Sequence, residues 1–278
     1  MSDNPIALIT GASSGIGREL ARVFAEHGHD LVITARRKER LAEVAAELGE
    51  RVRVETIPAN LATRNGIATL KKGLRERELE VDVLVNNAGA GASGQFVAAD
   101  AAKSLALIDL NVRALTDLTH FALPGMLERG RGRILNVASV AAFQALPGMS
   151  VYAASKAFVL SFTEALSEEL ANTPVTVTAL CPGLTRTEMV DDLQAAPDFM
   201  FASAAEVAEE GYRACRAGEV IRVPGVGNQA LVTWLQYQPR WLKRFLSGIA
   251  GRAAIAATGT ERGQEKDITA TAASASSR

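Results

Sequence analysis

Short apolar runs rich in Val, Ile and Leu alternate along this chain with longer segments whose apolar positions recur at helical spacing. Several short runs are almost continuously apolar, which is typical of strands buried on both faces of a parallel sheet. The pattern predicts seven strands, over Ile6–Thr10, Leu31–Ala35, Arg51–Ile57, Asp82–Asn86, Arg133–Ala138, Val175–Cys181 and Glu219–Val223. It predicts helices over Gly15–His27, Arg37–Leu48, Arg64–Arg77, Ala101–Glu128, Ser150–Ala171 and Ala204–Arg216.

This alternation predicts an α/β fold in which a doubly wound parallel sheet of about seven strands carries helices on both faces. Residues 1–228 contain neither an internal repeat nor a clear linker, so they are interpreted as one domain. Aromatic residues recur at roughly helical spacing over residues 229–257, interrupted by Pro239, and predict a C-terminal helical extension. Small and charged residues prevail over residues 258–278, which predicts a disordered tail.

Bulk composition narrows the function classes. Of the 278 residues, 48% are hydrophobic and 22% charged, which is typical of a soluble globular protein. The net charge of −1 provides no basic field for nucleic acid, and the histidines form no metal-ligand spacing with Cys181 and Cys215. We therefore expect neither nucleic acid nor metal as a partner. Neither a secretory signal nor a run of the ~18 apolar residues of a membrane span is visible, so a cytoplasmic location is expected.

A glycine-rich segment, Thr10–Gly17, follows the first predicted strand and opens the first helix. Gly11, Gly15 and Gly17 allow a tight turn and a close approach of the backbone to a pyrophosphate, whose charge suits a helix N-terminus. The glycine spacing differs from the usual G-x-G-x-x-G. Its position between strand and helix nevertheless favours a dinucleotide site over a tight turn that serves packing alone.

Tyr152 and Lys156 lie four positions apart on a predicted helix, so the phenol and the ammonium can point into one cleft. A phenol normally loses its proton near pH ~10, and a neighbouring cation favours the phenolate. Ser139, at the end of an apolar run, is a candidate third member. Each residue alone would be an ordinary surface or strand-end residue, but together they form a candidate acid/base site.

These motifs occur together in one order. Thr10–Gly17, the segment Asn86–Gly89, Ser139, Tyr152–Lys156 and the pair Pro182-Gly183 resemble, in order and spacing, the short-chain dehydrogenase/reductase family. The resemblance implies a Rossmann-like sheet with strand order 3-2-1-4-5-6-7 and a nicotinamide cofactor at its C-terminal edge. The switch-point rule for doubly wound sheets independently predicts a ligand at this edge.

The resemblance also implies roles for individual residues. Tyr152 resembles the catalytic acid/base, Lys156 the residue that lowers the phenol's pKa and bonds the nicotinamide ribose, and Ser139 the hydroxyl that holds the substrate carbonyl. Asn111 matches an asparagine that kinks its helix and holds a relay water behind Lys156. The implied cofactor-binding residues are Gly11, Ser13, Ser14, Gly15, Ile16, Gly17, Arg36, Arg37, Asn60, Leu61, Asn87, Ala88, Gly89, Tyr152, Lys156, Pro182, Gly183, Thr185 and Thr187.

The end of the second predicted strand bears on the choice of cofactor. An acidic residue there would bond the ribose 2′-hydroxyl of NAD, but this chain has Ala35 followed by Arg36 and Arg37. A guanidinium suits a 2′-phosphate, so we predict NADP(H); the alternative is that these cations merely begin a solvated helix. Asn60 stands where the family commonly has an aspartate, and its amide oxygen can still accept from the adenine amino group.

The combined prediction is an NADP(H)-dependent oxidoreductase that interconverts a carbonyl and an alcohol. Met and Phe residues in a predicted substrate lid over residues 186–203 favour an apolar substrate. One rival hypothesis is a nucleotide-sensing protein without turnover, which usually lacks the tyrosine or the lysine. Another is a peripheral membrane scaffold.

The resemblance implies a homodimer or a homotetramer. The aromatic stretch over residues 230–250 leaves four interpretations open. It packs as a docked core helix, covers the substrate cleft, joins a subunit interface, or rests on a membrane surface beside Arg240, Lys243 and Arg244.

Overall fold

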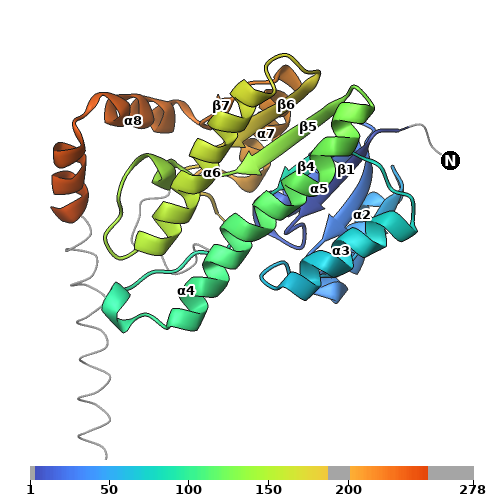
Figure 1. Ribbon diagram of the computed structural model, residues 1–278, viewed down its shortest axis with the longest axis horizontal. Coiled ribbons are helices and arrows are strands. Elements are labelled where there is room, and N and C mark those ends of the chain that lie inside the picture. Colours follow the sequence, from blue (N-terminus) through green and yellow to red (C-terminus); the bar gives the residue numbers. More distant parts are fainter. Residues whose placement is uncertain (1–3, 187–200, 250–278) are drawn as a thin grey trace, which may run out of the picture.

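The computed structural model describes residues 4–186 and 201–249. Its centre is a parallel seven-stranded sheet in the order β3-β2-β1-β4-β5-β6-β7 (Figure 1), and this confirms the predicted strand order. The strands are β1 Ile6–Thr10, β2 Asp30–Thr34, β3 Val54–Thr56, β4 Val81–Asn86, β5 Gly132–Val137, β6 Val175–Leu180 and β7 Ile221–Arg222. The α-helices are α1 Gly15–Glu26, α2 Lys38–Leu48, α3 Arg64–Glu76, α4 Ala101–Ile108, α5 Leu115–Glu128, α6 Ser150–Glu169, α7 Ala204–Ala217 and α8 Val226–Tyr237.

The two edge strands are shorter than their apolar runs predicted. β3 pairs only with β2 and β7 only with β6, so each forms hydrogen bonds on one side. The apolar pattern reports burial of a segment, whereas the length of an edge strand is set by how far its one neighbour extends beside it. The predicted tail over residues 258–278 lies outside the described residues.

Helices cover both faces of the sheet, and successive residues of each strand point to opposite faces. On β1, Ala7 and Ile9 pack into a core with α1, α2 and α7, while Leu8 between them packs against α3, α5 and α6. All three side chains are buried. The near-continuous apolar character of β1 therefore follows from its central place between two layers of helices.

The predicted helix over residues 101–128 is interrupted in its middle. A π-helical turn, η2, runs from Asp109 to Ala114 and separates α4 from α5. Such wider turns are frequent at functional sites, because they displace side chains from the regular helical register. Here the turn contains Asn111, whose side chain is buried.

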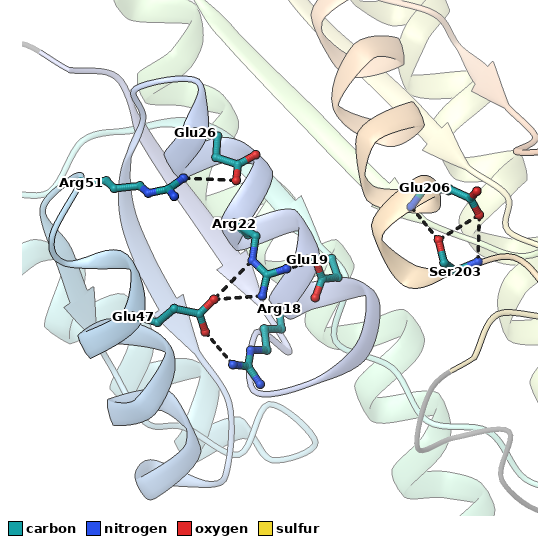
Figure 2. A network of polar contacts seen from close by, with 8 residues as sticks. All are labelled: Arg18, Glu19, Arg22, Glu26, Glu47, Arg51, Ser203 and Glu206. Carbon is teal, nitrogen blue, oxygen red and sulfur yellow. Dashed lines mark hydrogen bonds and ion pairs between the residues drawn. The ribbon is translucent and has the colours of Figure 1, made fainter.

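Ion pairs join the first two helices at the surface. Figure 2 shows Glu47 of α2 between Arg18 and Arg22 of α1, at 2.6 Å and 2.9 Å. A carboxylate shared by two guanidiniums loses less side-chain entropy per contact than separate pairs would. Figure 2 also shows the start of α7, where the Ser203 hydroxyl accepts from the Glu206 N–H and the Glu206 carboxylate accepts from the Ser203 N–H. This capping box satisfies two backbone donors at the helix end.

A chain of buried polar side chains crosses the centre of the sheet. Asn86 of β4 lies in register with Asn136 of β5, and Asn86 donates to Asn136 at 2.9 Å and to Thr119 at 3.1 Å. Asn136 in turn donates to the Thr163 hydroxyl of α6 at 2.9 Å. These bonds tie β4, β5, α5 and α6 together directly behind the strand ends.

We expect the substitution Asn136→Ala to lower the free energy of unfolding by about 2 kcal/mol, because it removes one hydrogen bond from each of two buried partners, Asn86 and Thr163. Urea unfolding followed by circular dichroism measures this loss. The exposed Asn65→Ala serves as the matched control, with an expected change below ~0.5 kcal/mol. Equal stabilities of the two variants would contradict the structural role of the chain.

Candidate active site

One cleft of ≈ 280 Å³ brings most of the predicted site together at the carboxyl ends of the strands. Asn111 is buried beside the cleft and does not line it, and Thr187, like most of the predicted lid over residues 186–203, lies outside the described residues. The predicted residues that line the cleft are Gly11, Ser13, Ser14, Gly15, Ile16, Gly17, Arg36, Arg37, Asn60, Leu61, Asn87, Ala88, Gly89, Ser139, Tyr152, Lys156, Pro182, Gly183 and Thr185.

The glycine turn has the space that a pyrophosphate requires. Gly11 and Gly15 have positive φ angles of 70° and 55°, which side chains other than glycine rarely adopt. A Cβ at Gly17 would lie 2.3 Å from the Gly11 carbonyl oxygen, so only glycine allows α1 to start this close. Ser14 precedes α1 without a side-chain capping bond, and the first turn contains no acidic residue. The N–H groups of this helix end therefore suit an anionic ligand.

Thr10, to which the motif analysis assigned no role, connects the end of β1 to the segment after β4 that lines the cleft. Its buried hydroxyl accepts from the backbone N–H groups of Asn87 and Ala88 at 3.0 Å and 2.9 Å and donates to the Val85 carbonyl. The Asn87 amide donates back to the Thr10 carbonyl at 2.9 Å. A polar residue at the last position of an otherwise apolar strand is the sequence signal for this role.

Arg37 lies across the glycine turn. Its Nη2 atom donates to the hydroxyls of Ser14 and Ser13 at 3.0 Å and 3.3 Å, which places a cation over the predicted phosphate site. Both Arg36 and Arg37 are exposed and line the cleft. Asn60 also lines it, but its amide oxygen accepts from the Ala62 N–H at 3.2 Å. The acceptor expected for adenine is thus already engaged in a local turn.

Ser139, Tyr152 and Lys156 share the inner end of the cleft. Ser139 follows β5 and accepts from the Ala141 N–H, which fixes its hydroxyl at the start of the 3-10 turn η3, Val140–Phe143. Tyr152 and Lys156 come from the first two turns of α6. The buried Lys156 Nζ atom donates to the Val137 carbonyl at 2.8 Å and lies 5.9 Å from the centre of the Tyr152 ring.

The prediction that Lys156 lowers the pKa of Tyr152 stays a prediction, because burial dominates the pKa of both groups. Burial raises the pKa of the Tyr152 phenol, and a hydrogen bond with Ser139 opposes this only in part. Burial also lowers the pKa of Lys156 to about 8. Near pH 8 a smaller fraction of this lysine is therefore protonated than of an exposed lysine. The physical reason is that desolvation penalises the charged form of each group.

Asn111 is held firmly behind these residues. Its amide oxygen accepts from the Ala90 N–H, and its amide nitrogen donates to the Ala90 carbonyl and to the Ser155 hydroxyl, at 2.9–3.0 Å. Gly89 separates it from the lysine: a Cβ there would lie 3.4 Å from the Asn111 oxygen and 3.5 Å from Lys156 Nζ. The π-helical turn thus places a polar side chain within reach of the buried ammonium.

The family of the chain follows from its sequence as well as its site. A family model described as short chain dehydrogenase matches residues 5–198. The chain therefore belongs to the short-chain dehydrogenase/reductase family. It is accordingly an oxidoreductase that acts on a carbonyl/alcohol pair with a nicotinamide cofactor.

Individual proteins show how similar the chain is to known members. Sulfoacetaldehyde reductase 2 of Chromohalobacter salexigens is 44% identical over 190 residues, which cover 68% of this chain and 75% of that protein. A short-chain dehydrogenase from Sphingobium yanoikuyae, solved in complex with NADPH, is 38% identical with a TM-score of 0.76, over 84% of this chain and 92% of that one. A family member from Burkholderia phymatum, solved in complex with NAD, is 26% identical with a TM-score of 0.74, over 83% and 92%.

The buried ammonium of Lys156 leads to a prediction about stability. Its pKa in the folded protein is about 8, below its ordinary value of 10.5. Burial of the charged lysine therefore lowers the free energy of unfolding by its full amount below pH 8. This loss disappears as the pH rises towards 10.5, where the lysine is neutral in the unfolded chain as well. After allowance for the lost bond to Val137, we expect Lys156→Met to be about 2 kcal/mol more stable than the wild type at pH 7. The difference should shrink by about pH 10.

Urea unfolding at both pH values measures this difference. Lys72→Met, at an exposed lysine of α3, is the matched control and should change stability little at either pH. A Lys156→Met protein less stable than the wild type at pH 7 would show that the ammonium stabilises the fold.

Proposed function

We propose that the chain is an NADP(H)-dependent reductase of an apolar ketone or aldehyde, with Tyr152 as its catalytic acid/base. The observation that carries the proposal is the convergence of Ser139, Tyr152 and Lys156 at the inner end of the same cleft whose outer end is the glycine turn. The free N–H groups at the start of α1 would hold the phosphates of a nicotinamide cofactor, and Tyr152 and Lys156 would face the part of it that supplies or accepts the hydride.

When bound, the nicotinamide supplies or accepts the hydride, and the residues of this chain handle the proton. Ser139 donates a hydrogen bond to the substrate oxygen, where negative charge develops during reduction. Tyr152 transfers its proton to that oxygen, and because burial raises the pKa of the phenol, this transfer requires that the phenolate be stabilised. We propose that Lys156 then stabilises the phenolate and that Asn111 positions a proton path to it.

The preference for NADP(H) rests on Arg37. Its guanidinium is held by two serine hydroxyls of the glycine turn, at the end of β2 where an acidic residue would favour NAD. A fixed planar cation suits a dianionic 2′-phosphate, both in charge and in its paired donors. We propose that Arg36 and Arg37 together contact this phosphate.

The proposal of an apolar substrate draws on the aromatic residues of segments near Ser139 and Tyr152 in the chain. The segments that follow β4 and precede α6 touch each other, since the Gly94 N–H donates to the Gly148 carbonyl at 2.8 Å. They carry Phe96 and Phe143, and the described end of the proposed lid adds Phe201. Aromatic and aliphatic walls favour a carbonyl compound with apolar substituents.

A screen of carbonyl compounds with NADPH, followed by the absorbance of the reduced nicotinamide, tests the reaction. With a compound that is turned over, we expect Tyr152→Phe to lower kcat by about 10²–10⁴-fold, because the proton donor is lost. The affinity for NADPH should stay within about threefold, since the phenol adds one hydrogen bond at most.

Tyr237→Phe, at an exposed tyrosine of α8, is the matched control and should retain full activity. Full activity of Tyr152→Phe would contradict the catalytic assignment. Binding of NADPH by the wild type without turnover of any carbonyl compound would favour the nucleotide-sensing alternative.

Cofactor preference has its own test. We expect Arg37→Ala to weaken NADPH binding by about 10–100-fold, the loss of one charge-assisted contact, and to leave NADH binding within about twofold. Fluorescence titration with both cofactors measures this difference. Arg213→Ala, at an exposed arginine of α7 that does not line the cleft, is the control. Equal losses for both cofactors would contradict the proposed phosphate contact.

A further inference from the structure

The last described part of the chain forms a pair of helices at one end of the molecule (Figure 1). The first is α8, and the second covers residues 240–249, with Pro239 between them. Two buried side chains of α8, Val232 and Leu235, attach the pair to the body, and Val232 packs in a core with Val159 and Val223. The Ser247 hydroxyl also donates to the Gln144 side chain at 3.4 Å. We call residues 226–249 the C-terminal helical pair.

The outward face of this pair is apolar and aromatic. Trp241, Phe245 and Ile249 recur every four residues along one side of the second helix, and 63%, 58% and 49% of each residue is exposed. On α8, Trp234 and Tyr237 are exposed as well. Single exposed apolar residues are ordinary, but a stripe of large apolar side chains along one helix, with further exposed aromatic residues on the helix before it, indicates an interaction surface.

The charges around the stripe are all of one sign. Arg240, Lys243 and Arg244 lie within five residues, and residues 220–249 contain neither Asp nor Glu. Among the described residues, none of the three cations forms an ion pair, although many arginines elsewhere do. The chain as a whole carries a net charge of −1, so this cationic segment is opposite in sign to the rest.

We propose that the C-terminal helical pair binds the surface of an anionic lipid bilayer. Trp and Tyr side chains prefer the interfacial layer of a bilayer, where an apolar ring and a polar edge are both satisfied. Arginine and lysine side chains beside them attract anionic headgroups. None of the described helices has the length and hydropathy needed to cross a membrane, so the contact is with the surface.

A second copy of this chain fits the same surface less well. A two-fold interface pairs the patch with itself, so it would bring two sets of Arg240, Lys243 and Arg244 into one interface. The patch contains no acidic residue to pair with them. Juxtaposed like charges at an interface disfavour association, whereas an anionic bilayer is complementary to them.

The pair also adjoins the cleft. Asn228 of α8 lies against the loop that follows β6, where a Cβ at Gly183 would lie 2.5 Å from the Asn228 amide nitrogen. A bilayer on the outward face of the pair is therefore close to the active-site end of the molecule. This places the cleft beside a reservoir of apolar compounds, although the lipid contact itself does not depend on the proposed reaction.

Co-sedimentation of the full chain with vesicles tests the proposal. We expect binding to vesicles of phosphatidylcholine with phosphatidylglycerol, and much weaker binding to phosphatidylcholine alone. The variant Arg240→Gln/Lys243→Gln/Arg244→Gln should lose about 100-fold in partitioning onto the anionic vesicles, at about fivefold for each cation. Trp241→Ser/Phe245→Ser should lose at least about tenfold. Added salt should weaken the binding of the wild type.

The matched control is Arg64→Gln/Lys72→Gln/Arg213→Gln, which removes three exposed cations from other faces and should bind as the wild type does. Circular dichroism and thermal unfolding check that all variants fold. Absence of wild-type binding, or equal loss in the control variant, would overturn the proposal. So would a stable oligomer that Trp241→Ser/Phe245→Ser converts to monomer without any vesicle binding, because the stripe would then be a subunit interface.

Discussion

The contact between the ends of β1 and β4 is the constraint on which the site depends. Here the strand order reverses, and the crossovers on either side leave in opposite directions, so a space opens that no helix fills. Thr10 and Asn87 hold the two strand ends together across this space through hydrogen bonds to each other's backbone. The glycine turn follows β1 at this junction, and the segment that follows β4 lines the same cleft.

The inner end of the cleft contains a buried cation that lowers the free energy of unfolding. A lysine is fully buried there, and its position is retained by one backbone carbonyl rather than by a carboxylate. Without a paired anion the ammonium stays easy to deprotonate, and the phenol beside it stays hard to ionise. Both shifts come from desolvation, and each favours the neutral form of its group. The buried Asn86–Asn136–Thr163 chain behind them supplies the rigidity that such a site requires.

The C-terminal helical pair has a different relation to the fold. Its inner side follows the same rule as the core helices, with Val232 and Leu235 against the body. Its outer side carries exposed aromatic side chains and three cations that form no ion pair with any residue the structure describes. A helical segment that packs on one side and exposes apolar side chains on the other is typical of a binding surface. The positive charge of this surface favours an anionic partner.

The sequence by itself determined the α/β class and the positions of most strands, because the burial of parallel strands is visible as a local apolar pattern, whereas the strand order came from the order and spacing of motifs that resemble the short-chain dehydrogenase/reductase family. Helix positions followed in the same way, since helical periodicity is visible in any window of about 15 residues. Only the tertiary structure decided the π-helical turn at Asn111, the role of Thr10, the engagement of Asn60 and the direction of the Tyr152 pKa. Each of these depends on groups far away in the chain: Ala90 and Ser155 for Asn111, Asn87 for Thr10, and the whole surrounding core for the desolvation of the phenol. A linear pattern states which side chains are present, but hydrogen-bond partners and burial exist only once distant segments meet.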